Sequence, residues 1–346
     1  MSESLRRLLV GVVAIAFCLV FVEVMVLRIS HVVHLDPLLL PDRTLGWRLI
    51  PNLNGAHKPY EVFTDRQGFR ISESGRGQDS RPFDVVFVGD SFCFGSGVDY
   101  SESLVGHFAR AHPKLSVANY GVPGYGTDQE YLILQRYILL LQPGGIVVIV
   151  TYINDFDDIR DRWYDARLKP WFTLSGSKLV LHKPHSLLNS LCWYCRTAYV
   201  IAHLIVTAGW VTPRIGGTYA YADRLYGALL MRMARLVAQR RGRLVIVYTS
   251  GQEAGSADAL QREESARCWA ERTNSGFIDL DAMPDAQNPG LYMKNDVHWN
   301  ATGGLLNYDY FVARLGAAAD FAGHAAKQRC PSLQSLGQAR QASVDN

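Results

Sequence analysis

The chain has 346 residues, of which 48% are hydrophobic, and a formal net charge of +3 at pH 7. This length suffices for one large domain or two small ones. The charge is small and forms no long basic block, so the sequence lacks the electrostatic pattern of a nucleic-acid-binding protein. Six cysteines are too few for a disulfide scaffold of this size, so the core has to come from burial of apolar side chains.

The N-terminal region contains a long apolar segment. Residues 8–28 are apolar except for Glu23 and the final arginine, and about 20 apolar residues are needed to cross a bilayer. Arg6 and Arg7 precede this segment. By the positive-inside tendency, residues 1–7 then stay in the cytoplasm while the rest of the chain is exported. We therefore expect a single transmembrane anchor over residues 8–28.

Two alternatives to an anchor remain open. A cleaved signal peptide would have a shorter apolar core and a small-x-small cleavage site, whereas mostly large residues follow Val24. The other alternative is a buried helix of a soluble domain. With an uncleaved anchor, the chain is a single-pass membrane protein whose main domain lies outside the cytoplasm, on the periplasmic or cell-surface side.

Two segments beside the main domain have compositions that disfavour regular helices. Residues 29–80 contain four prolines, and because proline interrupts long helices, we expect an extended lead segment that joins the anchor to the main domain. The tail, residues 323–346, is polar and rich in Gln and Ser, and we expect it to be disordered.

Between residues 81 and 322, runs of β-branched and aromatic residues alternate with helix-like stretches. The predicted strands are the run from Asp84 to Gly89, Leu115–Asn119, Ile146–Tyr152, Leu244–Thr249 and Phe277–Leu280. The predicted helices are Ser103–Ala111, Asp128–Leu141, Ala222–Arg240, Ala257–Thr273 and Thr302–Leu315. This alternation predicts an α/β fold with a parallel sheet covered on both faces, in which the active site lies beyond the carboxyl ends of the strands.

One long interval interrupts the alternation. Residues 156–219 separate the third predicted strand from the next clear helix, which is too long for a simple loop. We expect this insertion to form a lid or a substrate-binding element. Within it, residues 187–211 are strongly apolar but contain Arg196 and His203, which favours a buried or membrane-surface helix over a second membrane span.

Polar residues follow the predicted strands at the expected edge of the sheet. Ser91 lies in a strand-to-helix turn after the first strand, where its hydroxyl is exposed. The glycine-rich loop 121–126 follows the second strand and allows the backbone to approach a ligand closely. Asn154 follows the third strand, and Asp296 and His298 lie late in the chain, just before a predicted helix.

These side chains supply the parts of a nucleophilic active site. A serine is a poor nucleophile near neutral pH and needs an adjacent base. His298 can remove the Ser91 proton, while Asp296 fixes the imidazole tautomer and stabilises the imidazolium. The Asn154 amide and backbone N–H groups of the serine turn and the glycine loop can donate hydrogen bonds to a developing oxyanion.

Four segments resemble blocks I, II, III and V of the SGNH/GDSL hydrolases. They are GDSF at 89–92, NYGVPG at 119–124, YIND at 152–155 and the late D-x-H formed by Asp296 and His298. The resemblance extends from about residue 83 to about residue 317. It implies the flavodoxin-like three-layer α/β/α sandwich of that superfamily, preceded here by the N-terminal transmembrane helix.

The resemblance also implies a role for each matching residue. Ser91 is the nucleophile and the first oxyanion donor, Gly124 is the second donor, Asn154 is the third, and His298 is the base. With Asp296 as the orienting acid, the expected catalytic residues are Ser91, His298 and Asp296.

The sequence departs from the family pattern in two blocks. Tyr152 replaces the glycine of block III, which narrows the space beside Asn154. In block V the usual aspartate position, three residues before the histidine, is Asn295, and Asp296 is two residues before it. The resulting D-x-H-W block resembles the branch that includes alginate O-acetyltransferase-like proteins.

The expected function is that of a serine esterase, which forms an acyl-enzyme at the outer face of a membrane and acts on a small acyl ester or an acylated carbohydrate. Two alternatives remain open. One is an O-acetyltransferase that modifies a cell-surface polysaccharide, as the D-x-H-W block suggests. The other is a catalytically silent binding protein with the same fold, for which Tyr152 is the main support.

We expect no cofactor and no metal ion. The acidic group formed by Asp155, Asp157, Asp158 and Asp161 lacks the spacing of a calcium loop, and a solvated helix start explains it more simply. Cys192 and Cys195 have a half-zinc or redox spacing without a second pair, so a local disulfide and plain burial are both open. A disulfide between Cys268 and Cys330 is conceivable from the sequence.

Overall fold

We describe the fold from a computed structural model of the chain. The structure describes residues 2–29, 37–56, 59–75, 82–164, 167–184, 186–210, 215 and 217–319. The predicted disordered tail, residues 323–346, and Cys330 lie outside the described residues.

A sheet of eight strands organises the main domain, in the order β14-β13-β8-β6-β7-β5-β4-β3. The first five of these strands pair in parallel, and the remaining pairs are antiparallel. The parallel strands are β6 (Phe83–Gly89), β7 (Val117–Gly121), β8 (Leu141–Tyr152), β13 (Arg243–Thr249) and β14 (Gly276–Asp279). They coincide with the five predicted strands to within a few residues.

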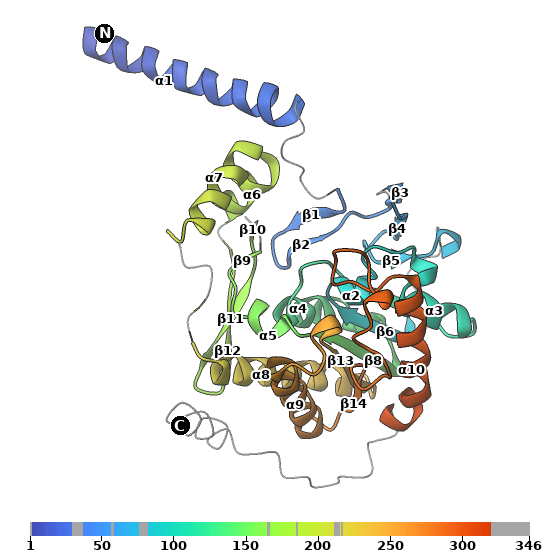
Figure 1. The fold of residues 1–346 in the computed structure, drawn as a ribbon. Helices are drawn as coiled ribbons and strands as arrows, with labels where there is room; N and C mark the ends of the chain where they lie inside the picture. Colours follow the sequence, from blue (N-terminus) through green and yellow to red (C-terminus); the bar gives the residue numbers. More distant parts are fainter. Residues whose placement is uncertain are drawn as a thin grey trace.

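Helices cover both faces of this sheet (Figure 1). In β6, Val86 and Val88 face one core, which also contains side chains of α4, α8 and α9, whereas Val85 and Phe87 face a second core with α3 and α10. This alternation follows from the two-residue period of a strand. The helices are α3 (Leu104–Ala111), α4 (Thr127–Tyr137), α8 (Tyr219–Gln239), α9 (Ala257–Arg272) and α10 (Ala301–Ala319). The predicted three-layer α/β/α sandwich is confirmed.

The lead segment is not a separate connector, and the sheet is not wholly parallel as predicted. Three short strands of this segment, β3 (Asn54–Ala56), β4 (Val62–Thr64) and β5 (Arg70–Ile71), extend the main sheet through the pair Arg70 and Asn119. Two further strands, β1 (Leu39–Asp42) and β2 (Gly46–Leu49), form a hairpin of their own. The described parts of this segment, residues 37–56 and 59–75, contain no long helix, in agreement with the prediction from the prolines.

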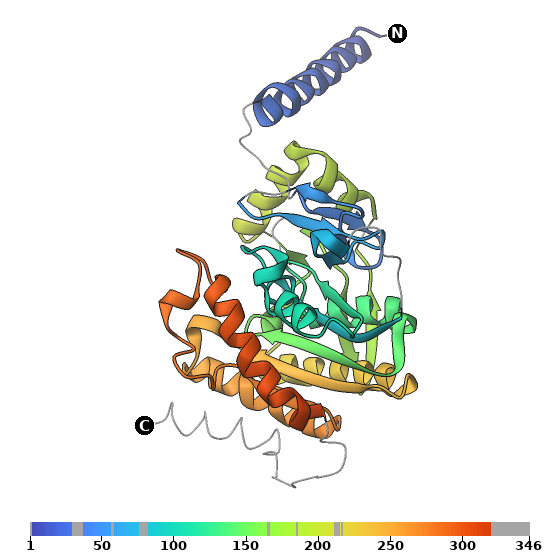
Figure 2. The ribbon, with the colours of Figure 1, turned by 90° about the vertical axis from the view of Figure 1, so that its right-hand side faces the viewer.

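The N-terminal apolar segment is helical, and its first part, helix α1, projects away from the main domain (Figure 2). Helix α1 spans Glu3–Phe21 and continues as a π-helical segment, Val22–Ile29. The part from Glu3 to Met25 is long and apolar enough to cross a membrane, and none of it is buried against the protein. A helix with these properties fits a membrane anchor or a signal sequence.

The insertion folds into small elements of its own. Helix α5 (Asp155–Asp158) leads into strands β9 (Trp163–Tyr164), β10 (Arg167–Leu168), β11 (Trp171–Ser175) and β12 (Lys178–His182). The apolar stretch within 187–211 forms two helices, α6 (Ser186–Tyr194) and α7 (Arg196–Thr207), which are separated at Cys195. Each is too short to span a membrane. Cys192 and Cys195 are free thiols, so they do not form the local disulfide that the sequence left open.

Candidate active site

Ser91 stands at the sharp turn between β6 and the short helix α2 (Ser91–Phe94). The Asp90 side chain accepts a hydrogen bond from the Phe92 N–H at 2.8 Å and thereby caps α2. Gly89 permits the turn, because a Cβ at this position would lie 2.5 Å from the Cβ of Cys93. The buried side chains of Phe92 and Cys93 pack in the second core and that of Phe94 packs in the first, so packing of the three following residues fixes the serine.

His298 reaches this serine from the loop that precedes α10. Its Nε2 lies 2.7 Å from the Ser91 Oγ, and its Nδ1 lies 2.6 Å from the Asp296 Oδ1. The Asp296 carboxylate also accepts a hydrogen bond from the His298 backbone N–H. Asn295 has a φ of 60°, a left-handed conformation that asparagine tolerates. The three predicted catalytic residues therefore form one continuous hydrogen-bonded series.

The charge of Asp296 is held by its histidine. Partial burial alone would raise the pKa of this carboxyl, but the hydrogen bonds and the charge of His298 outweigh burial and lower the pKa. The Asp296 side chain is 43% exposed and that of His298 is 20% exposed. The acid is thus ionised at neutral pH and partly solvated, as required to stabilise an imidazolium that forms and disappears during a reaction.

Aromatic rings surround the serine turn. The Phe92 ring stacks on the Tyr152 ring with centroids 4.2 Å apart, meets the Trp299 ring edge-on at 4.9 Å, and lies 5.1 Å from the His298 ring. Tyr152, the residue that replaces the block III glycine, therefore packs against the residue next to the nucleophile. Such aromatic contacts restrict the side chains that carry them, and they fix the orientation of the histidine ring.

The loop that contains Gly124 is held by β2 and by the insertion. The Trp47 indole donates to the Pro123 carbonyl at 3.1 Å, and the Tyr125 hydroxyl donates to the Trp47 carbonyl at 2.6 Å. Gly124 has a φ of +77°, and a Cβ there would lie 2.4 Å from the Tyr164 ring. Only glycine fits beneath this ring, and the insertion thus lies directly against the predicted second oxyanion donor.

Asn154 follows β8 and precedes α5. Its side-chain nitrogen donates to the Asp158 Oδ2 at 2.8 Å. One N–H of the amide is occupied in this way and fixes the side chain, and the second remains as a donor. Burial, opposed by the charge of Lys169 and aided by neighbouring carboxyls, raises the pKa of Asp158 to about 7.

A group of buried acidic side chains lies behind the nucleophile. Asp90, Asp128, Glu130 and Asp155 are each at most 1% exposed, and the Lys169 ammonium donates to the Asp128 Oδ1 at 2.8 Å. Among the described residues, no group donates a hydrogen bond to either Glu130 oxygen. The expectation of a solvated helix start was wrong for Asp155, because this carboxyl is completely buried.

The burial of these carboxyls changes their protonation. It raises the pKa of Asp90 to about 6, against hydrogen bonding and the charge of His298, which lower it. Burial also raises the pKa values of Glu130 and Asp155 strongly, and the mutual repulsion among the carboxyls adds to the shift. Burial therefore favours the neutral forms of Glu130 and Asp155. The sequence alone did not identify Glu130 or Lys169, since burial of a charged residue leaves no periodic signal.

Ser91 and His298 open onto a small pocket. Its cavity volume is about 10 Å³, on the scale of a single ordered water molecule. Other residues that line it are Phe92, Gly95, Ser96, Val98, Leu104 and Trp299. Among the residues that the structure describes, no group of three or more His, Cys, Asp or Glu side chains has the geometry to hold a metal ion.

Known proteins resemble this chain in structure rather than in sequence. No family model and no curated protein matches the sequence. A structure of TesA aligns with a TM-score of 0.44 at 12% identity and covers 68% of this chain and 98% of that chain. A lipolytic protein of the G-D-S-L family from Veillonella parvula aligns with a TM-score of 0.39 at 15% identity, over 66% of this chain and 96% of its own.

The esterase EstA from a Pseudoalteromonas species aligns with a TM-score of 0.41 at 11% identity, over 67% of this chain and 96% of its own. Several of the matching structures carry the GDSL or SGNH family name. At such low identities they carry no information about the activity of this chain, which has to be inferred from its own residues.

Proposed function

We propose that the chain is a membrane-anchored serine hydrolase of the SGNH type that cleaves esters of small acyl groups. The observation that carries this proposal is the series from Ser91 Oγ to His298 Nε2 at 2.7 Å and from His298 Nδ1 to Asp296 Oδ1 at 2.6 Å. Residues 207 positions apart meet here in the geometry that general-base activation of a serine requires.

The proposed reaction has two halves. Ser91 Oγ attacks the acyl carbon while His298 Nε2 takes the hydroxyl proton, and His298 then gives that proton to the leaving alkoxide as its bond to the acyl carbon breaks. Water enters next and loses a proton to His298, and its oxygen attacks the acyl-enzyme. The proton returns to Ser91 as the free acid leaves. Asp296 stabilises the imidazolium in both halves.

Three donors are proposed to stabilise the oxyanion in each half. They are the backbone N–H groups of Ser91 and Gly124 and the side-chain amide of Asn154. The tight backbone at Gly124 and the hydrogen bond that fixes Asn154 support this assignment, because donors that are held in advance need no reorganisation during the reaction. Each such donor typically contributes about 3 kcal/mol to the transition state.

The small pocket supports a small acyl group. Its volume of about 10 Å³ leaves no room for a fatty acyl chain beside Ser91. An acetyl ester, free or on a carbohydrate, carries one of the smallest acyl groups and is therefore the substrate class that we propose. With the helix Glu3–Met25 as anchor, the main domain would meet such substrates at the outer face of a membrane.

Hydrolysis of p-nitrophenyl acetate by the full chain in detergent tests the proposal. Wild type and Ser101→Ala, a change at an exposed serine, are expected to hydrolyse this ester, whereas Ser91→Ala and His298→Ala are expected to be inactive. A fluorophosphonate probe should label Ser91 only when His298 is present. Equal rates in wild type and Ser91→Ala, or no labelling of the folded protein, would favour a silent binding protein instead.

A second candidate is transfer of the acetyl group to a carbohydrate hydroxyl. The small pocket fits this reaction equally well, and the buried Trp299 beside His298 completes the D-x-H-W block that first suggested it. Incubation of the full chain with p-nitrophenyl acetate and a soluble oligosaccharide decides between the two. A mass increase of the oligosaccharide that depends on Ser91 favours the transferase, and release of free acetate alone favours the hydrolase.

A further inference from the structure

Glu23, the one acidic residue within the apolar part of the N-terminal helix, is bound by helix α7 of the insertion. Its Oε1 accepts a hydrogen bond from the Arg196 N–H at 2.9 Å. Its Oε2 accepts hydrogen bonds from the Thr197 N–H at 2.7 Å and from the Thr197 hydroxyl at 2.9 Å. The first N–H groups of a helix have no partner within it and carry a partial positive charge. Glu23 therefore caps α7 across more than 170 residues of sequence.

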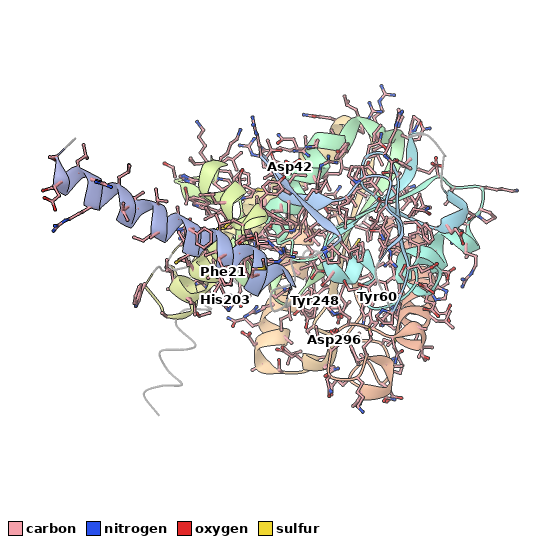
Figure 3. All side chains as sticks on the ribbon, turned by 90° about the horizontal axis from the view of Figure 1, so that it is seen from above. Phe21, Asp42, Tyr60, His203, Tyr248 and Asp296 are labelled. Atoms are coloured by element: carbon pink, nitrogen blue, oxygen red, sulfur yellow. The ribbon has the colours of Figure 1, made fainter. Side chains whose placement is uncertain are left out.

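This contact fixes the place of the insertion relative to the anchor. Glu23 lies near the end of the apolar helix Glu3–Met25, at the level where an anchor leaves the hydrocarbon region. A carboxylate at this depth is costly unless it is hydrogen-bonded, and α7 supplies the donors. In the view from above (Figure 3), the labelled Phe21 of the N-terminal helix projects over the same side of the molecule as the labelled His203 of α7. Helix α7 thus begins where the bilayer surface would lie.

The pair formed by α6 and α7 has two different sides. Cys192, Trp193 and Ala202 are buried, and the Arg167 guanidinium lies 4.3 Å from the Trp193 ring centre. The other side is apolar and exposed. It carries Leu191 at 46%, Tyr194 at 63%, Ile201 at 50% and Leu204 at 60% exposure, and Trp210 follows α7 at 81%.

We propose that this exposed side of α6 and α7, together with Trp210, rests in the interfacial region of the lipid bilayer beside the anchor. Residues 186–210 include no acidic side chain, and Trp and Tyr are the side chains that favour the membrane interface. Lipid is the occupant because the anchor is itself surrounded by lipid, and Glu23 holds α7 against that same lipid. A second copy of the chain would have to displace this lipid from α6 and α7.

The proposal goes beyond ester cleavage but rests on the proposed anchor. Trp210 provides a built-in reporter, since it is the only exposed residue among the seven tryptophans. The full chain is reconstituted in phosphatidylcholine discs with and without brominated phosphatidylcholine, which quenches tryptophan only at short range. We expect the brominated lipid to quench the wild-type emission, and most of this quenching to be lost in Trp210→Phe.

A charged double variant tests the surface while it keeps the reporter. In Ile201→Glu/Leu204→Glu, both changes fall on exposed side chains, and we expect quenching of Trp210 to fall to the level of Trp210→Phe. Leu139→Glu, a change at a 75% exposed leucine outside the insertion, is the matched control and should retain wild-type quenching. Far-ultraviolet circular dichroism checks that each variant is folded.

Three outcomes would overturn the proposal. The first is a wild type that enters the discs without any quenching by brominated lipid. The second is pairing of chains in one disc, measured by mass, that disappears in the charged double variant, because that result assigns the surface to a second copy. The third is a chain that does not remain with the discs, which removes the anchor as well. Ester hydrolysis is not part of the readout, so these results do not depend on the proposed activity.

Discussion

The Asn154 side-chain amide donates a hydrogen bond to the Asp158 carboxyl, with 2.8 Å between Nδ2 and Oδ2. The two residues lie at the start and the end of the first turn of α5, so a four-residue helix fixes the proposed oxyanion donor. The contact makes Asp158 a positioning residue, since it acts on the reaction only through Asn154.

Removal of the donor Asn154 and removal of its hydrogen-bond partner Asp158 should lower kcat by different amounts. Asn154→Ala should lower kcat by about 10² to 10³ with little change in KM, because this donor serves the transition state. Asp158→Ala leaves the amide in place but free to rotate, so its loss of kcat should be smaller. Steady-state kinetics with p-nitrophenyl acetate separate the two parameters, and Asp309→Asn, a change at an exposed aspartate of α10, is the control. If both Asn154→Ala and Asp158→Ala changed only KM and left kcat unaltered, Asn154 would not be an oxyanion donor.

Substitution of Gly124 separates the effect of backbone strain from the effect of contact with the Tyr164 ring. Gly124→Ala places a methyl group against the Tyr164 ring and forces a left-handed alanine, whereas Gly176→Ala causes the same kind of strain at a φ of +61° in open space. Both changes should cost about 1 kcal/mol of stability from backbone strain. Only Gly124→Ala should also lose activity, because it alone displaces the proposed donor loop. Equal activities of the two variants would contradict a role of Gly124 as an oxyanion donor.

The pocket beside Ser91 predicts a preference for short acyl chains. Each methylene that does not fit costs about 1 to 3 kcal/mol, so p-nitrophenyl acetate should be cleaved at least about tenfold more efficiently than the octanoate. Val98→Ala removes two methyl groups from the pocket wall and should raise kcat/KM for the butyrate relative to the acetate. Val245→Ala, a buried change in β13 away from the pocket, should leave this ratio unchanged.

The buried carboxyls predict a stability that falls as the pH rises. A carboxyl with a raised pKa in the folded protein binds a proton that the unfolded chain has lost, so folding is favoured at low pH. The loss begins near the ordinary carboxyl pKa of about 4. It is complete for Asp158 near pH 7, and Glu130, whose pKa burial also raises strongly, contributes a loss of the same sign.

Glu130→Gln imitates the neutral form and removes one contributor to this fall. We expect the variant to exceed wild type in free energy of unfolding at pH 8 by on the order of 1 kcal/mol or more, and to approach wild type at pH 4. Urea unfolding across this range measures the difference. Glu264→Gln, at an exposed glutamate, should follow wild type at every pH, and a constant difference between Glu130→Gln and wild type would contradict the titration.

Local sequence patterns predicted the strands of the central sheet. They also predicted the edge of the sheet at which the three catalytic candidates lie. The runs that form β6, β8 and β13 are rich in β-branched residues, and each ends in turn residues, so both the strands and their carboxyl ends could be located. Because the carboxyl ends of parallel strands lie at one edge of the sheet, the pattern predicts Ser91 and Asn154 at that edge, with His298 as the partner of Ser91.

Other features depend on contacts between distant residues and leave no local pattern. β5 is only two residues long, and it becomes a strand because Arg70 pairs with Asn119 of β7. Glu130 lies in a polar stretch of α4 that resembles a solvated helix, although its side chain is completely buried. The Glu23 contact with α7 was likewise invisible, since neither segment predicts the other.

The antiparallel strands of the lead segment set a limit on how far the proposed enzyme can work from its membrane. With β3, β4 and β5 built into the main sheet and β1 paired with β2, only residues 30–36 separate the end of the N-terminal helix from the described residues that begin at Pro37. Even a fully extended chain of this length covers at most about 25 Å. The catalytic domain would therefore stay close to the lipid surface. A substrate farther from the membrane would have to diffuse to the enzyme.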